Sequence, residues 1–277
     1  MTLPERTVAG HALPIIGFGT YRLTGATGTD TIVDAIHAGY RLIDSAVNYE
    51  NEGAVGAAVR NSGVPRDELI VTSKLPGRHH AADQARATIE ESVFRTGLDH
   101  IDLYLIHWPN PKVDRYVEAW GALIEARQRG LIRDIGVSNF LPEHLARLTA
   151  ETGVAPMVNQ IELHPYFPQT EALAYHREHG ILTESWSPIG RANDLLSDPK
   201  IVSIANKLGI SPAQTVLAWH IKVGAIPLPK ASSIERQREN IDLADIELSE
   251  DDVAAITGLG FPEGRTNDQD PAVYQEF

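Results

Sequence analysis

The sequence contains no cysteine, and this absence excludes several kinds of chemistry. Without thiols the chain forms no disulfide, uses no thiolate nucleophile and binds no zinc through cysteine. It also lacks any run of about 18 apolar residues, so no transmembrane helix is expected. The first residues, MTLPERTVAGH, contain no cationic segment followed by the apolar stretch of a secretory signal. We therefore expect a cytoplasmic protein that is not bound to a membrane.

Positive charge is also scarce, because 24 Lys and Arg residues stand against 37 Asp and Glu residues, a formal net charge of −13. Nucleic acids and anionic membranes need a cationic protein surface, so neither is an expected partner. The acidic surface and the lack of an obvious exposed apolar stripe favour a monomer. Hydrophobic residues make up 43% of the 277 positions, enough for a large core, and no Pro-, Gly- or Ser-rich linker divides them. Residues 1–277 are expected to form a single domain.

Short apolar runs alternate with longer amphipathic segments, which predicts repeated βα units and a parallel sheet. Eight uninterrupted units fit a closed (β/α)8 TIM barrel better than an open doubly wound sheet. The expected strands are 15–21, 41–46, 69–75, 101–107, 132–138, 156–162, 181–187 and 225–230. The expected helices are 28–39, 51–61, 81–97, 115–129, 142–152, 169–179, 212–223 and 233–243.

Three further segments fall outside the eight units. Residues 7–18 are expected to form an N-terminal hairpin that covers the bottom of the barrel. Residues 191–209 are expected to insert an extra helix before the seventh unit's helix, and 250–259 to add one after the eighth. Only the short segment 264–277 then remains as a lid, so we expect a fairly open site.

Four polar side chains follow the ends of three expected strands: Asp44, Tyr49, Lys74 and His107. Active residues of a parallel barrel gather at the carboxyl ends of its strands, so these four can converge. Each has a bland alternative, because a lone Asp often caps a helix, a lone Tyr lies on a rim, and a strand-end His is often structural. Together an acid, a phenol, an ammonium and an imidazole suit proton donation to a carbonyl oxygen.

Several longer motifs make a specific resemblance. The segments GFGTYR, RLIDSAVNYENEGAVG, VTSKLP, LYLIHWP, GVSNF, NQIELHP, SWSPIG and IPLPKASSIERQREN resemble the signature of the aldo-keto reductase superfamily, in family order. The similarity covers about residues 5–270. Length and the short C-terminal end are most similar to its bacterial diketogluconate-reductase-like and prostaglandin-synthase-like branch.

The resemblance implies NADPH-dependent reduction of an aldehyde or ketone. Tyr49 would donate the proton, Lys74 and Asp44 would adjust the pKa of its phenol, and His107 would orient the carbonyl. A free phenol has a pKa of about 10, and an ammonium about 4 Å away would bring that pKa towards neutrality. Donors placed around the carbonyl oxygen stabilise the negative charge that develops as hydride arrives. This chemistry needs no metal.

The hydride must come from a cofactor, because no side chain supplies one. A Rossmann fingerprint is absent, since Gly17 and Gly19 are followed by Arg22 where a third glycine is needed. The resemblance implies instead that Ser138, Asn139 and Gln160 hold the nicotinamide amide. It further implies stacking of Trp186 on the ring, with Ser187 and Ile189 lining the pyrophosphate. The alternative for Trp186 is ordinary packing at the barrel rim.

The segment 230–236 has two compatible interpretations. Ser232 and Glu235 form the S-x-x-E pattern of a capping box, which predicts a helix start. The same helix N-terminus, with Lys230 and Arg236, can bind an adenosine phosphate. Many relatives have a hydroxyl residue where this chain has Ala231, so NADPH is expected but NADH is possible. Glu239 and Asn240 match the adenine-binding positions of the family.

The substrate is less constrained by the sequence. Tyr21, Val47 and Trp108, with Pro76, should line an apolar and aromatic pocket for small aldehydes, ketoaldehydes or keto sugars. The pair His79–His80 is interpreted as a solvated loop and not a metal site, because no third metal ligand is evident, and contact with the substrate is the other alternative. A metal-dependent hydrolase would need several His and carboxylate ligands, such as an H-x-H, and none appears. The remaining alternative is a non-catalytic nucleotide-binding barrel that serves as a regulatory or scaffold subunit.

Overall fold

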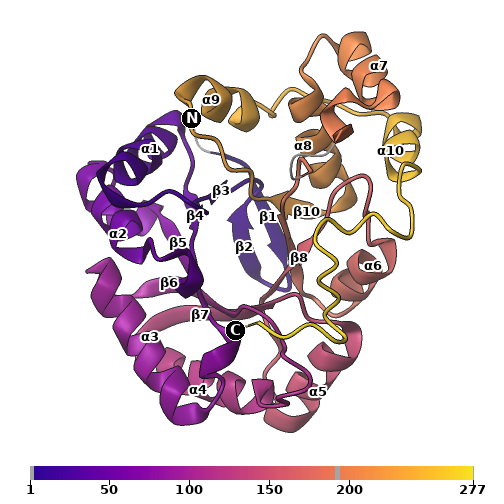
Figure 1. Ribbon diagram of the computed structural model, residues 1–277. Helices are drawn as coiled ribbons and strands as arrows, with labels where there is room; N and C mark the ends of the chain where they lie inside the picture. The colour runs from indigo at the N-terminus through magenta and orange to yellow at the C-terminus, as the bar shows by residue number, and fades with distance from the viewer. Residues whose placement is uncertain (1–2, 191–193, 277) are drawn as a thin grey trace.

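A ring of eight parallel strands surrounded by helices forms the body of the molecule (Figure 1). The computed structural model describes residues 3–190 and 194–276. The strands follow one another around the ring in chain order, from β3 to β10. They are β3 (Phe18–Gly19), β4 (Leu42–Asp44), β5 (Ile70–Leu75), β6 (Ile101–Ile106), β7 (Ile132–Ser138), β8 (Val158–Glu162), β9 (Leu182–Trp186) and β10 (Ala225–Pro227).

The first and last strands close the ring. The Gly17 amide donates a hydrogen bond to the Pro227 carbonyl at 3.0 Å, and the Gly19 amide donates to the Pro229 carbonyl at 3.1 Å. These two bonds join β3 to β10, so the predicted (β/α)8 barrel is confirmed. Both strands are shorter than predicted. Pro227 and Pro229 have no N–H, so they accept hydrogen bonds from β3 but cannot donate any to it. The regular hydrogen-bond ladder between β3 and β10 therefore ends early.

Each strand is followed by at least one helix on the outside of the barrel, as predicted. These helices are α1 (Gly25–Ala38), α2 (Glu52–Asn61), α3 (Ala82–Thr96), α4 (Tyr116–Gln128), α5 (Pro142–Thr152), α6 (Thr170–Glu178), α8 (Pro212–Val223) and α9 (Ile234–Ile241). The expected extra elements also form: η4 (Asp194–Ser197) and α7 (Pro199–Leu208) precede α8, and α10 (Glu250–Thr257) follows α9. Residues 191–193, where the first of these was expected to begin, lie outside the described residues. No helix within the described ranges is long and apolar enough to cross a membrane.

An N-terminal hairpin closes one end of the barrel, as predicted. Strands β1 (Glu5–Val8) and β2 (His11–Pro14) pair antiparallel, and Ala9 and Gly10 form the turn with φ of 51° and 86°. Two successive positive φ angles match the twist of a hairpin. Leu13 packs with the apolar side chains that fill the lower barrel, and Figure 1 shows β1 and β2 within the ring of strands.

The barrel interior changes from apolar to polar along the strands. Side chains two residues apart on a strand point to the same face, so each strand contributes successive interior layers. The lower layer is buried and apolar, and it includes Leu42, Val158 and Leu182. Two residues further along the same three strands are the buried polar side chains Asp44, Gln160 and Glu184. This polar layer forms the floor of the candidate site.

Candidate active site

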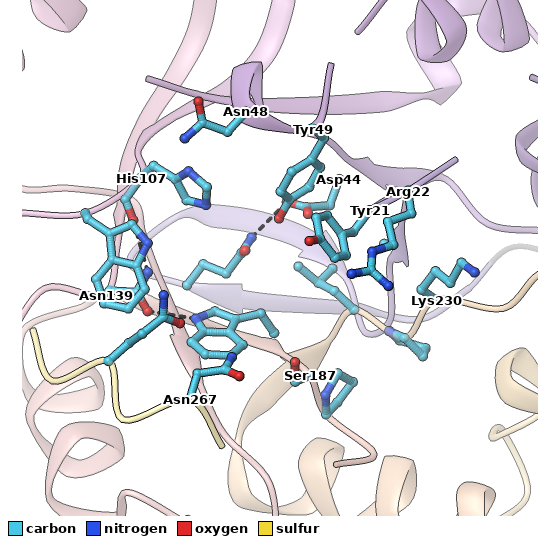
Figure 2. A pocket seen from close by; sticks show the side chains of 18 of the residues that line it. Tyr21, Arg22, Asp44, Asn48, Tyr49, His107, Asn139, Ser187, Lys230 and Asn267 are labelled. Atoms are coloured by element: carbon cyan, nitrogen blue, oxygen red, sulfur yellow. Dashed lines mark hydrogen bonds between the residues drawn. The ribbon is translucent and has the colours of Figure 1, made fainter. Parts of the chain in front are cut away.

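A cavity of about 570 Å³ opens at the carboxyl ends of the strands. Figure 2 shows Tyr49 and His107 toward one end of this pocket and Arg22 and Lys230 toward the other. Its wall includes strand-end residues and part of the C-terminal tail. Of the residues singled out in the sequence, the wall contains Tyr21, Asp44, Tyr49, His107, Trp108, Asn139, Gln160, Trp186, Ser187, Ile189 and Lys230.

A fully buried ion pair lies beneath this cavity. The Lys74 ammonium donates to both oxygens of Asp44, at 2.6 and 2.8 Å, and to the Ser45 carbonyl at 2.8 Å. Burial by itself favours the neutral amine. The charge and hydrogen bonds of Asp44, together with Tyr49 and Glu184, outweigh this effect and raise the pKa of Lys74, so the side chain remains an ammonium. Asp44 therefore serves as the partner of Lys74 and not as a helix cap.

Tyr49 stands next to this ion pair. It ends the short helix η1 (Val47–Tyr49), and its hydroxyl accepts a hydrogen bond from the Lys74 ammonium at 3.5 Å. Burial raises the pKa of Tyr49, while the charge of Lys74 lowers it and that of Asp44 raises it again. The net direction is upward, so the expected pKa near neutrality is not found, because burial outweighs the ammonium. The phenol is consequently protonated at neutral pH, as a proton donor must be.

His107 lies on the other side of Tyr49, with 6.0 Å between the ring centroids. Its backbone amide donates to the Leu75 carbonyl at 2.9 Å, which fixes the end of β6 against β5. The structure thus brings Asp44, Lys74, Tyr49 and His107 together, although three strand ends supply them.

The C-terminal tail adds a residue that the sequence did not reveal. Glu276 Oε1 lies 2.7 Å from His107 Nδ1, although without the alignment of a hydrogen bond. The same carboxylate accepts from Asn48 Nδ2 at 2.6 Å and from the Gly77 amide at 2.8 Å. Burial raises the pKa of Glu276, but His107 and these donors outweigh it, and the net direction is downward.

The tail is held in place by contacts along its length. Asn110 clamps the backbone of Glu276, donating to its carbonyl at 2.8 Å and accepting from its amide at 3.0 Å. The Tyr274 ring lies 4.5 Å from that of Trp108. Thr266 donates to Glu162 Oε1 from its amide and hydroxyl, at 2.7 and 2.6 Å. The segment expected to be a lid therefore forms part of the pocket wall. In Figure 1 this tail runs in yellow from α10 past α6 toward the C-terminus. No local sequence pattern pointed to these contacts.

The residues expected to hold the nicotinamide form a connected network. Asn139 has a left-handed φ of 63°, and its amide nitrogen donates to the His107 carbonyl and to Ser138 Oγ, both at 3.0 Å. Its oxygen accepts from Trp186 Nε1 at 2.7 Å, which fixes the indole (Figure 2). Ser138 Oγ donates to the Gln160 carbonyl at 2.8 Å. Ser138 therefore lies behind Asn139 and outside the pocket wall.

The pocket wall also includes Trp186–Gly190 and Leu228–Lys230. Arg22, which breaks the glycine pattern in the sequence, lines the pocket too, with a left-handed φ of 65°. The sequence contained a signal for this position, because Arg22 directly follows Tyr21, which was already expected to line the pocket.

The residues expected at the adenosine end lie just before α9 and along it. The predicted capping box is wrong by one residue: Ser233, not Ser232, is the N-cap, and its hydroxyl accepts from the Arg236 amide at 3.4 Å. Glu235 then occupies the second helical position and cannot complete the box. Lys230 and Arg236 are exposed at this helix start. Of the two expected adenine-binding residues, Asn240 is buried and Glu239 half-buried, and neither lines the cavity.

Two further expectations differ from the structure. Val47 lies in η1 but not on the pocket wall, because the turn presents Asn48 and Tyr49 to the cavity instead. The pair at 79–80 is not a solvated loop: His80 is buried, and burial lowers its pKa to about 4. His79 Nδ1 bonds to the Thr88 hydroxyl at 2.8 Å. Within the described ranges, no three His, Asp or Glu side chains form a cluster that could hold a metal.

Known proteins share this sequence and fold. The chain is 53% identical over 261 residues to 2,5-diketo-D-gluconic acid reductase B of Corynebacterium sp. (strain SHS752001), covering 94% of each chain. It is 41% identical over 263 residues to methylglyoxal reductase DkgA of Escherichia coli (strain K12), covering 95% of this chain and 94% of that one.

Solved structures agree with this likeness. A Bombyx mori aldo-keto reductase in complex with NADP superposes with a TM-score of 0.89 at 34% identity, covering 99% of this chain and 98% of that one. An aldo/keto reductase from Brucella melitensis also gives 0.89, at 41% identity, covering 93% of this chain and all of that one. The sequence model of the Aldo/keto reductase family matches residues 15–260. The chain therefore belongs to the aldo/keto reductase family.

Proposed function

We propose that this protein reduces aldehydes and ketones to alcohols with NADPH, and that Tyr49 is the general acid. The observation that carries this proposal is the 3.5 Å contact between the Tyr49 hydroxyl and an ammonium that Asp44 holds in the barrel floor. Family membership and the NADP complex of a related reductase support the cofactor. A nucleotide-binding scaffold would have no need of this arrangement, so the catalytic function is favoured.

The reaction divides between cofactor and protein. When bound, NADPH would supply the hydride for this reduction. Tyr49 donates its hydroxyl proton to the carbonyl oxygen, so that the carbonyl is reduced to an alcohol. Lys74 stabilises the phenolate that remains, and Asp44 keeps Lys74 charged and oriented. His107, 6.0 Å from Tyr49 between ring centroids, orients the carbonyl from the opposite side.

The proposed cofactor fits the residues along the pocket wall. Gln160, Asn139 and Trp186 line the pocket with Tyr49 and would hold the nicotinamide. Ser187, Ile189 and Arg22 line it too and suit a pyrophosphate. Lys230 and Arg236 flank the N-terminus of α9, where backbone amides and a helix dipole favour a phosphate group.

The substrates are proposed to be small aldehydes, ketoaldehydes or keto sugars. Tyr21, Trp108 and Tyr274 give the wall an aromatic side, and Asn48, Asn267 and Gln269 give it hydrogen-bonding groups. Such a mixture suits a short carbonyl compound that carries hydroxyl groups. The relatives named as a diketogluconic acid reductase and a methylglyoxal reductase act on compounds of these kinds. We further propose a cytoplasmic, monomeric, single-domain protein.

The test follows the loss of NADPH absorbance with methylglyoxal, an aromatic aldehyde and a keto sugar. Turnover by the wild type and a loss of at least about a hundredfold in Tyr49→Phe are expected, since that is the range of general-acid catalysis. Equal activity in both proteins would remove Tyr49 from the assigned role. Tight NADPH binding with no turnover by the wild type would instead favour the scaffold.

A further inference from the structure

Glu184 is a buried carboxyl group that the mechanism above does not use. It lies on β9 in the polar layer of the barrel, two residues beyond Leu182, and it is fully buried. It is not on the wall of the pocket. Its contact with the site runs through Gln160, which is on that wall.

The amide nitrogen of Gln160 lies between two carboxyl groups. It donates to Asp44 Oδ1 at 2.9 Å and to Glu184 Oε2 at 2.8 Å. An amide nitrogen has two hydrogens, so these bonds use its full donor capacity. A flipped amide would instead place its oxygen against the carboxylate oxygen of Asp44, and Glu184 Oε2 would lose this donor. Asp44 and Glu184 therefore specify which way the Gln160 amide points.

The amide oxygen of Gln160 receives no hydrogen bond from the described residues, although Gln160 lines the pocket. We propose that Glu184 is a positioning residue, which with Asp44 turns this oxygen toward the pocket as the acceptor for the carboxamide N–H of the nicotinamide. This inference rests on the proposed NADPH-dependent function. Through Gln160, Glu184 would make the site bind a nicotinamide carboxamide more tightly than a ring substituent that has no N–H to donate.

A purely structural role explains Glu184 less well. Its second oxygen, Oε1, has no hydrogen-bond partner among the described residues, and an unsatisfied buried polar atom destabilises a fold. Burial and the charge of Asp44 on β4 raise the pKa of Glu184 to about 7, against the opposing effects of Gln160 and of Lys74 on β5. An apolar residue such as Leu182, two positions earlier, would fill the space without this penalty.

The test compares two cofactors that differ only at the carboxamide. Binding of NADPH and of its reduced 3-acetylpyridine analogue, which lacks the N–H donors, is measured by fluorescence titration. The wild type should bind NADPH about tenfold more tightly, the effect of one hydrogen bond. Glu184→Leu should lose most of this preference, whereas Glu184→Gln should keep it, because a glutamine oxygen can still accept from Gln160. If Glu184→Leu does not fold, Glu184→Met also removes the acceptor, with a side chain of similar length.

Two controls separate positioning from damage to the fold. Adenosine 2′,5′-bisphosphate has no nicotinamide, so its affinity should be the same in all variants. Glu52→Gln changes another buried glutamate, which bonds to Ser73 and Arg95 away from Gln160, and should keep the preference. An undiminished preference in Glu184→Leu, or none in the wild type, would overturn the inference. A wild type that neither binds nor oxidises NADPH would instead contradict the proposed function.

Discussion

Glu276 Oε1 lies 2.7 Å from Nδ1 of His107, so the C-terminal tail contacts the group expected to orient the substrate carbonyl. The carboxylate also holds the Gly77 amide and the Asn48 side chain. One residue thus links the tail to the loops after β4 and β5 and to the end of β6.

Replacing Glu276 should impair the use of substrate more than the binding of cofactor. Glu276→Gln removes the charge that faces His107 and that accepts from Asn48 and Gly77, and hydrogen bonds to charged groups contribute about 1.5–3 kcal/mol. We expect a loss of about tenfold or more in kcat/KM with an unchanged Kd for NADPH. Steady-state kinetics check this against Glu263→Gln, an exposed change earlier in the tail. Equal kcat/KM in Glu276→Gln and Glu263→Gln would show that the contact between Glu276 and His107 does not affect catalysis.

The Asp44–Lys74 pair should show strong coupling in stability. Lys74→Met leaves Asp44 as a buried carboxylate without its counterion, which should lower the free energy of unfolding by about 3 kcal/mol or more. The double variant Asp44→Asn, Lys74→Met removes both charges and should recover part of that loss. Urea denaturation measures stability, and neither variant should reduce carbonyls at the wild-type rate. If the stability loss of the double variant equals the sum of the losses of Asp44→Asn alone and Lys74→Met alone, a direct pairing is contradicted.

Glu184 should make stability depend on pH. Its folded pKa is about 7, whereas a glutamate in an unfolded chain has a pKa of about 4.3. Between these values the native state keeps a proton that the unfolded state has lost, so stability falls as pH rises through this window. Between about pH 5 and about pH 8, the wild type should lose roughly 3 kcal/mol relative to Glu184→Gln. Parallel stability curves would show that the carboxyl titrates normally.

The cationic residue between β10 and α9, Lys230, should govern the choice between NADPH and NADH. Lys230 is exposed beside the N-terminus of α9, where a phosphate is proposed to bind. Lys230→Met should weaken NADPH binding by about tenfold and leave NADH binding unchanged, because only NADPH carries the extra phosphate. Lys222→Met, an exposed lysine in α8, is the matched control. An equal loss for both cofactors would place Lys230 against the pyrophosphate instead.

Two glycines of α2 should respond differently to alanine. A Cβ at Gly56 would lie 1.7 Å from the Thr96 carbonyl oxygen, so α2 would have to move away from the end of α3. Gly56→Ala should therefore lower the free energy of unfolding by about 3 kcal/mol. A Cβ at Gly53 would meet its nearest atom, the Arg95 carbonyl oxygen, at 3.6 Å, an ordinary contact. Gly53→Ala should raise stability by about 0.5 kcal/mol or more, since alanine favours helix. Thermal unfolding distinguishes the two.

The barrel and its polar end were predictable because alternation and strand ends are local properties. Strand 132–138 and helices 142–152 and 212–223 have the predicted bounds. The four groups expected at the strand ends do converge, since parallel strands bring their carboxyl ends to one side. The cap of α9 was misplaced by one residue, because adjacent serines at 232 and 233 offer the same hydroxyl and only the backbone conformation selects between them.

The sequence by itself determined the order of the strands and helices, the polar residues at the strand ends, and the family. Only the tertiary structure decided that Glu276 faces His107, that Glu184 reaches Gln160, and that burial raises the pKa of Tyr49. The physical reason is distance along the chain. Periodicity specifies the face and end of an element on which a side chain lies. Contacts between distant segments, and the burial they create, depend on closure of the barrel and on the path of the tail.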